Sequence, residues 1–234
     1  MKKRLLLLLL WAPFFSHSQD RNEFWLKINL GHRFSERLSV SLDVQHRRQA
    51  NYRTKDENIF HYPLANNMRI WVNYRLPHNW MLVLSPIGYF NNEDILNSNG
   101  ELRLTNEWRV SPGIIKSFNI GKIKNSNRLL LDARFAGINS HDYFFQSRFR
   151  LQDSFTMPLF TLKKRSRFAW LLSNEVLLKK EKRSGGFDQN RLYNALQWEN
   201  PHTGVDIGYQ WVLQKGLNSS FRKDQLFIIL NISI

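Results

Sequence analysis

Apolar and polar residues alternate along this chain with almost no exceptions. Within residues 38–48, the apolar set Leu38, Val40, Leu42 and Val44 alternates with serine, aspartate, glutamine and arginine. Successive side chains of a β-strand point to opposite faces, so the pattern predicts a strand with one apolar and one polar face. The same period recurs at 24–30, 68–76, 128–135, 143–152, 205–214 and 225–234, and more weakly at 80–90, 102–112, 167–178 and 189–198.

The length of these stretches narrows the fold class. Strands of soluble sheets usually run about 5–6 residues, whereas membrane barrels use strands of about ten residues that alternate apolar outward and polar inward. Mean hydropathy is −0.45 although 14% of residues are aromatic, as this interleaving requires. We therefore expect an all-β fold, a transmembrane antiparallel β-barrel, with a secreted β-sandwich or soluble barrel as the alternative.

The strand count and connections give an expected topology. The pattern yields eleven strands, but bacterial single-chain barrels have even counts, so we expect about 12 strands, with 10 as the alternative. A missed strand would lie in 112–126 or 153–166. The short connections 35–37, 77–79 and 200–202 are expected in the periplasm, and the long loops 49–66, 91–101, 179–188 and 214–222 outside the cell.

The N-terminus has the three parts of a secretory signal. A basic start at residues 2–4 precedes an apolar run over residues 5–15, and Ser16 and Ser18 stand before Gln19. The apolar run is too short to span a bilayer as a helix. We therefore expect residues 1–18 to be a signal peptide and residues 19–234 to form a barrel in the bacterial outer membrane, with an uncleaved N-terminal anchor as the alternative.

N-terminal sequencing tests this processing directly. Protein recovered from the membrane fraction should begin at Gln19, because Ser16 and Ser18 supply the small residues that signal cleavage requires. A chain that still begins at Met1 would contradict the prediction.

Two segments near the C-terminus resemble a known family. Residues 187–193 read FDQNRLY and residues 206–211 read DIGYQW. Together with the upstream segments 173–175, 148–150 and 101–103, they resemble the family catalogued as domain of unknown function 2490, over essentially the whole mature chain. The resemblance implies a bacterial outer-membrane β-barrel and no assigned activity.

The composition and motifs argue against an enzyme. The chain has no cysteine, which excludes a thiol nucleophile and a thiolate metal site. Its histidines lack metal-ligand spacing, and it contains no P-loop, nucleophile elbow or dinucleotide fingerprint. We therefore predict no catalytic residues, no metal site and no cofactor.

Two alternative functions remain open. A lipid-modifying enzyme would use a histidine near the outer rim, and His46 lies near the outer end of its strand. However, Ser39 and Ser41 fall on the opposite face of that strand, so a triad with them would need a bulge. The second alternative is a membrane-embedded scaffold or receptor acting through its outer loops.

The polar phase carries many charges that a barrel would bring inside. Charges sealed in a lumen must be paired or hydrated, and arginine forks suit bidentate contacts with carboxylates. Glu175 and Arg191 fall on neighbouring strands and are the best expected pair. The expected lumen charge network comprises Asp43, Arg69, Arg75, Arg103, Glu107, Arg109, Arg128, Asp132, Arg134, Arg148, Arg150, Glu175, Arg191 and Asp206.

This network has two interpretations. The first is a structural salt-bridge ladder that fills a narrow barrel. The second is passive transport of small anionic solutes, because arginines outnumber acids and fixed positive charge attracts anions. For a conducting pore we expect anion preference, reduced by neutralising Arg148 and Arg150 together.

The formal net charge of +15 also bears on partners. The basic runs 179–183 and 163–167 fall in an expected outer loop and an expected periplasmic turn, and the first would meet the phosphates of lipopolysaccharide. The export signal and the apolar stripes argue against nucleic acid. We therefore expect outer-membrane lipids, including lipopolysaccharide, as partners; the sequence makes no prediction of oligomeric state.

Overall fold

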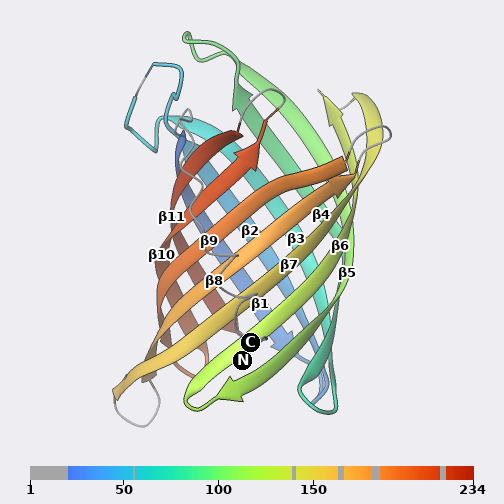
Figure 1. Cartoon of the computed structure of the whole chain (residues 1–234), viewed down its shortest axis with the longest axis vertical. Helices are drawn as coiled ribbons and strands as arrows, with labels where there is room; N and C mark the ends of the chain where they lie inside the picture. The colour runs from blue at the N-terminus through green and yellow to red at the C-terminus, as the bar shows by residue number, and fades with distance from the viewer. Residues whose placement is uncertain (1–20, 55, 139–140, 163–165, 181–184, 217–219) are drawn as a thin grey trace, which may run out of the picture.

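The chain folds into a closed β-barrel (Figure 1). A computed structural model describes residues 21–54, 56–138, 141–162, 166–180, 185–216 and 220–234, so the predicted signal peptide, residues 1–18, and Gln19 lie outside the described residues. The strands are β1 (Arg21–Arg33), β2 (Leu38–Gln49), β3 (Tyr62–Leu76), β4 (Trp80–Ile95), β5 (Leu102–Ile120), β6 (Ile123–Ile138), β7 (His141–Leu162), β8 (Ser166–Lys180), β9 (Gly185–Glu199), β10 (Thr203–Lys215) and β11 (Ser220–Ser233).

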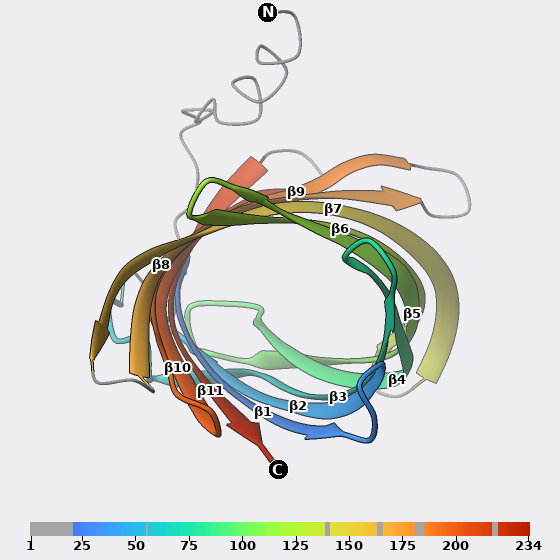
Figure 2. The ribbon, with the colours of Figure 1, turned by 90° about the horizontal axis from the view of Figure 1, so that it is seen from below.

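Each strand pairs antiparallel with its neighbours in sequence, and the ring closes between the first and last strands. Figure 2 shows β1 lying between β2 and β11. The β1–β11 ladder is parallel and runs from Arg21 opposite Lys223 to Gly31 opposite Ser233. Because closure removes every sheet edge, the barrel satisfies its backbone groups without water, which a membrane requires. The predicted all-β transmembrane barrel is confirmed.

The strand number differs from the expected 12 or 10. Across the described residues there are eleven strands, which is the number that the alternation itself gave. The described residues of 112–126 and 153–166 hold no twelfth strand, because 112–120 and 123–126 belong to β5 and β6, and 153–162 and 166 belong to β7 and β8. Because strand direction alternates along the chain, the first and last of eleven strands run in the same direction and pair as parallel strands. Parallel strands also form regular backbone hydrogen bonds, so the ring still closes.

The strands run from 12 to 22 residues and extend into segments expected to be loops. Residues 62–66 begin β3 and residues 91–95 end β4, for example. We call the end of the barrel with segments 50–61 and 96–101 the loop end, and the opposite end the turn end. At the turn end, His78 and Asn79 have φ of 57° and 60°, the left-handed pair that a tight two-residue hairpin turn uses.

Large apolar side chains cover the outer wall. Leu30, Leu42 and Ile70 are direct neighbours across β1, β2 and β3, and Leu131 and Ile207 on other strands are 49% and 53% exposed. These positions belong to the apolar phase of the sequence pattern. An apolar outer band around a closed barrel is the arrangement that lipid requires. Across the described residues, no helix is both long enough and apolar enough to span a bilayer.

The two faces of β2 should differ sharply in tolerance to arginine. Leu42→Arg places a charge on the outer band, which costs about 2–4 kcal/mol near the bilayer midplane. Ser41→Arg places the same side chain in the lumen, where Ser41 lines a polar cavity. Folding yield into lipid vesicles should therefore fall far more for Leu42→Arg; equal yields would contradict the assignment of the two faces.

Part of the lumen is packed by aromatic side chains. Phe227 is fully buried and stacks on Tyr193 with ring centroids 4.2 Å apart, and Trp25 packs against both rings. Gly208 makes room for this packing, since a Cβ there would lie 2.6 Å from the Phe227 ring and 2.3 Å from the Asn194 carbonyl oxygen. This cluster narrows the lumen beside β9, β10 and β11, and its Trp25 and Tyr193 form part of the wall of a polar cavity.

Candidate functional site

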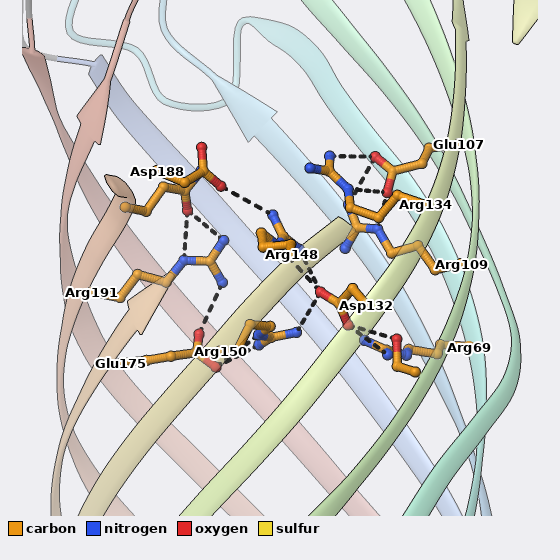
Figure 3. Close-up of polar contacts among 12 residues, drawn as sticks. Arg69, Glu107, Arg109, Asp132, Arg134, Arg148, Arg150, Glu175, Asp188 and Arg191 are labelled. Atoms are coloured by element: carbon orange, nitrogen blue, oxygen red, sulfur yellow. Dashed lines mark hydrogen bonds and ion pairs between the residues drawn. The ribbon is translucent and has the colours of Figure 1, made fainter. Parts of the chain in front are cut away.

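A network of arginines and carboxylates lies in the lumen, centred on Asp132 of β6 (Figure 3). Asp132 is completely buried, and its Oδ1 accepts a hydrogen bond of 2.6 Å from the Ser111 hydroxyl. Its Oδ2 accepts from Nε and Nη2 of Arg148, at 3.2 and 3.0 Å. Arg69 and Arg150 approach within 3.5 and 3.7 Å. One carboxylate thus faces three guanidinium groups.

Glu175 of β8 is the second centre. Its Oε1 accepts from Nε and Nη2 of Arg150, at 2.9 and 2.7 Å, and from Nη2 of Arg128 at 3.1 Å. Its Oε2 accepts from Nη1 of Arg191 at 3.4 Å, the pair singled out from the sequence. Arg150 therefore links the Asp132 and Glu175 centres across β6, β7 and β8 (Figure 3).

Glu107 of β5 is the third centre. Arg134 donates through Nε and Nη2 to the two carboxylate oxygens, at 2.6 and 2.7 Å, and Arg109 also bonds both oxygens. The Arg109 guanidinium carbon lies 3.6 Å from the centroid of the Phe90 ring, and that of Arg69 lies 4.0 Å from the centroid of the Trp71 ring. These stacking contacts hold both guanidinium groups at the cavity wall.

Two smaller charge groups lie on β1, β2 and β11. Asp43 accepts from Nζ of Lys27 at 3.2 Å and from the Trp71 indole at 3.1 Å. Glu23, which is 1% exposed, pairs with Nη2 of Arg47 at 2.6 Å and with Nζ of Lys223 at 3.3 Å. Charge therefore lines the side of the lumen opposite the Asp132 centre as well.

The predicted residues separate into those inside the network and those outside it. Asp43 lies in the separate group with Lys27, and Asp206 accepts from Gln197 at 3.3 Å. Arg75 is exposed near the turn end, and Arg103 is 48% exposed near the loop end, 3.8 Å from Asp94. The structure brings together Arg69, Glu107, Arg109, Arg128, Asp132, Arg134, Arg148, Arg150, Glu175 and Arg191.

Sequence reasoning missed Asp188, which lies 3.6 Å from Nη1 of Arg148. A strict period of two puts Asp188 on the face opposite Arg191. The β8–β9 ladder, however, shifts register, because Leu177 pairs with Gln189 and Leu178 with Phe187. Asp188 is thus the extra residue of a β-bulge, and the bulge turns it inward. The alternation did put Glu23 on the polar phase, but did not mark it as a lumen acid.

A cavity of about 460 Å³ lies between these groups. Nine lysines and arginines but only three carboxylates line it. Adding Arg134 and the acids that pair with these cations, Glu23, Glu107, Asp132 and Asp188, gives ten cations against seven acids around the cavity. The surroundings of the cavity therefore keep a surplus of positive charge when these paired acids are included.

Some guanidinium donors at this cavity have no acceptor among the described residues. They are Nε and Nη2 of Arg69, Nε of Arg128 and Nε of Arg47, all of which are buried atoms. A buried donor without a partner is costly, and costlier on a charged group. All three residues line the cavity, but these four atoms are themselves buried, so a group in the cavity meets other parts of the three side chains. The described residues contain no group of three or more His, Asp or Glu side chains able to hold a metal.

The fold and the lumen define a transmembrane β-barrel with a cationic interior. The chain belongs to the family described as protein of unknown function DUF2490, whose match covers residues 22–221. No curated protein matches the chain. Among solved structures it is similar to LpxR from Salmonella typhimurium, at a TM-score of 0.50 and 6% identity, with 83% of each chain covered. At that identity the likeness shows the barrel fold alone.

Proposed function

We propose that this protein is a bacterial outer-membrane barrel whose lumen takes up small anions and lets them pass between the loop end, outside the cell, and the turn end, in the periplasm. The observation that supports it most is the surplus of positive charge around the cavity, which nine lysines and arginines line together with only three carboxylates. Charged rings of one sign select ions of the opposite sign in other pores.

The structural ladder explains only part of the network. Asp132, Glu175 and Glu107 hold Arg148, Arg150 and Arg134 through two hydrogen bonds each. These pairs stiffen the wall. Arg69 is different, because its Nη2 lies 3.5 Å from Asp132 without hydrogen-bonding geometry. The paired arginines thus act as scaffold, while Arg69 and Arg128, which line the cavity with fewer contacts to carboxylates, contribute positive charge to it.

Inorganic phosphate tests uptake into the lumen. In planar bilayers with potassium chloride, added phosphate should lower the single-channel current in a concentration-dependent way, because a divalent anion binds the guanidinium groups more tightly than chloride. Potassium gluconate at the same concentration is the control for ionic strength. A current that phosphate and gluconate change equally would contradict a specific anion site in the lumen.

The lipid-modifying alternative has one supporting contact, on the outer wall. Nδ1 of His46 lies 2.8 Å from Oδ1 of Asn66. Ser41 lines the lumen cavity, and Ser39 shares its face of β2, so neither serine lies beside His46. A histidine and an asparagine without a nucleophile do not make a hydrolytic site. Anion passage is therefore the function we propose.

A further inference from the structure

A carboxylate faces outward within the apolar band. Asp153 of β7 follows Gln152, which lines the lumen cavity, so the Asp153 side chain lies on the outer wall. Its neighbours on the same face of the strand are apolar on both sides, namely Leu151 toward the loop end, which is 47% exposed, and Phe155 toward the turn end. Charged side chains are costly at such a position, and those that occur there usually face a partner or a cavity.

The described residues satisfy only one side of this carboxylate. Oδ1 of Asp153 accepts a hydrogen bond of 2.6 Å from Nδ2 of Asn125 on β6. Oδ2 accepts none within the described residues, and it is not among the buried atoms of the barrel. Because acyl chains carry no hydrogen-bond donor, lipid leaves this oxygen without compensation. A donor that reaches it must come from another molecule.

A matching donor lies two strands away on the same wall. Asn194 of β9 also faces outward, because its neighbour Tyr193 lines the lumen cavity. Oδ1 of Asn194 accepts from the Trp170 indole at 2.6 Å, and its Nδ2 makes no hydrogen bond within the described residues. Asn174 of β8, which pairs with Asp153 in the sheet, lies between the two strands. One wall thus offers both an unused acceptor and an unused donor.

Asp153 and Asn194 lie at nearly the same depth in the membrane. The row of paired residues that starts at Trp80, at the turn end of β4, passes Asp153 and ends at Asn22, at the loop end of β1. For strands about 4.8 Å apart and tilted by about 40°, two steps along this row rise by about 6 Å. Asn194 lies two residues from the row member Leu192 toward the turn end, which lowers it by about 5 Å.

We propose that the outer wall of β7, β8 and β9 is the interface of a homodimer, in which Oδ2 of Asp153 accepts from Nδ2 of Asn194 of the partner subunit. A twofold axis along the membrane normal brings together residues of equal depth from opposite sides of the axis. With the axis at β8, β7 of each copy meets β9 of the other, so the contact forms twice. The exposed Leu151 and Leu196 surround it with apolar surface. This interface is separate from the lumen and from anion passage.

Disulfide crosslinking locates the interface. The chain has no cysteine, so a single introduced thiol reports one position. Leu172 lies on the outer wall of β8 between two cavity-lining residues, and side chains near a twofold axis meet their own copies. Leu172→Cys in lipid vesicles should therefore form disulfide-linked dimers when copper phenanthroline oxidises the thiols. Ile70→Cys is the control on the outer wall of β3, five strands from β8 in one direction and six in the other, and should remain monomeric.

Leucine variants test the hydrogen bond itself. Energy transfer between donor-labelled and acceptor-labelled barrels, measured across protein-to-lipid ratios, gives the dissociation constant of the dimer. Asp153→Leu should raise this constant about tenfold, because the symmetric contact is lost twice. Asn194→Leu should act in the same direction. Asn66→Leu removes an outer-wall asparagine on β3, the hydrogen-bond partner of His46, and should leave the constant unchanged.

Folding yield separates a lost contact from a damaged barrel. Asp153→Leu takes a charge off a lipid-facing wall, so its yield in vesicles should be at least that of the wild type. The Leu172→Cys crosslink still decides the question if Asp153→Leu does not fold.

Three outcomes would overturn the proposal. The first is a wild-type barrel that stays monomeric at every protein-to-lipid ratio, which would leave Asp153 to a lipid ammonium group or to another membrane protein. The second is equal crosslinking of Leu172→Cys and Ile70→Cys, and the third is an unchanged dissociation constant in Asp153→Leu. None of them bears on conductance, so anion passage through the lumen stands or falls on its own measurements.

Discussion

Replacing Asp132 with alanine is expected to lower the free energy of unfolding by about 3–5 kcal/mol, because removal of one partner of a buried pair leaves an uncompensated charge. Asp132 is fully buried and holds Arg148 through two hydrogen bonds. Arg69 and Arg150 lie within 4 Å of the same carboxylate, so the variant strands up to three guanidinium groups. Urea unfolding in lipid vesicles, followed by tryptophan fluorescence, measures the loss.

Two further variants make this prediction specific. Asp94→Ala removes a carboxylate that is 40% exposed near the loop end, and it should cost less than about 1 kcal/mol. Adding Arg148→Met to Asp132→Ala should recover part of the loss, because it removes one stranded charge. Equal costs for Asp132→Ala and Asp94→Ala would contradict a network that stabilises the barrel wall.

Neutralising Arg69 and Arg128 together should move the anion-to-cation permeability ratio toward one. Arg69→Gln and Arg128→Gln remove two of the three surplus charges, while Asp132 keeps Arg148 and Glu175 keeps Arg150. The sequence suggested neutralising Arg148 and Arg150 to reduce anion preference, but that double variant is a less suitable test. It would strip Asp132 and Glu175 of their closest partners and destabilise the barrel.

Arg37→Gln is the matched control for this double variant. Arg37 is exposed in the turn between β1 and β2 and does not line the cavity, so its neutralisation changes the net charge of the protein without changing the cavity wall. The permeability ratio of Arg37→Gln should equal that of the wild type. A double variant with the same ratio as the wild type would show that the surplus charge does not set selectivity.

The barrel could be predicted from the sequence because most strands have one face in contact with lipid and the other face toward the polar lumen. Leu42, Ile70 and Leu131 reach lipid, and the residues beside them reach the lumen. The alternation becomes unclear where both faces are apolar. In β11, Phe227 and Ile229 pack inside the barrel between outward-facing apolar residues, so residues 226–230 are all apolar. The faces could still be assigned there, because Gln225, Asn231 and Ser233 on either side of this apolar run mark the polar phase.

The lumen network was predicted less completely, for two physical reasons. Period-two reasoning assigns a face but not a height along the strand, so Arg75 and Arg103 were grouped with residues far from them along the barrel. Bulges also change the face, as at Asp188. The contact between His46 and Asn66 on the outer wall could not be recognised from spacing, because the two residues meet only through the register of β2 and β3.

The reversal potential of the wild-type barrel across a potassium chloride gradient tests the cationic lumen most directly. Because the lumen holds more arginine and lysine than carboxylate, chloride should carry most of the current, and the potential should have the sign of anion preference. A reversal potential of the opposite sign would contradict the surplus-charge account, and the absence of any conductance would contradict passage and favour a ladder that closes the barrel.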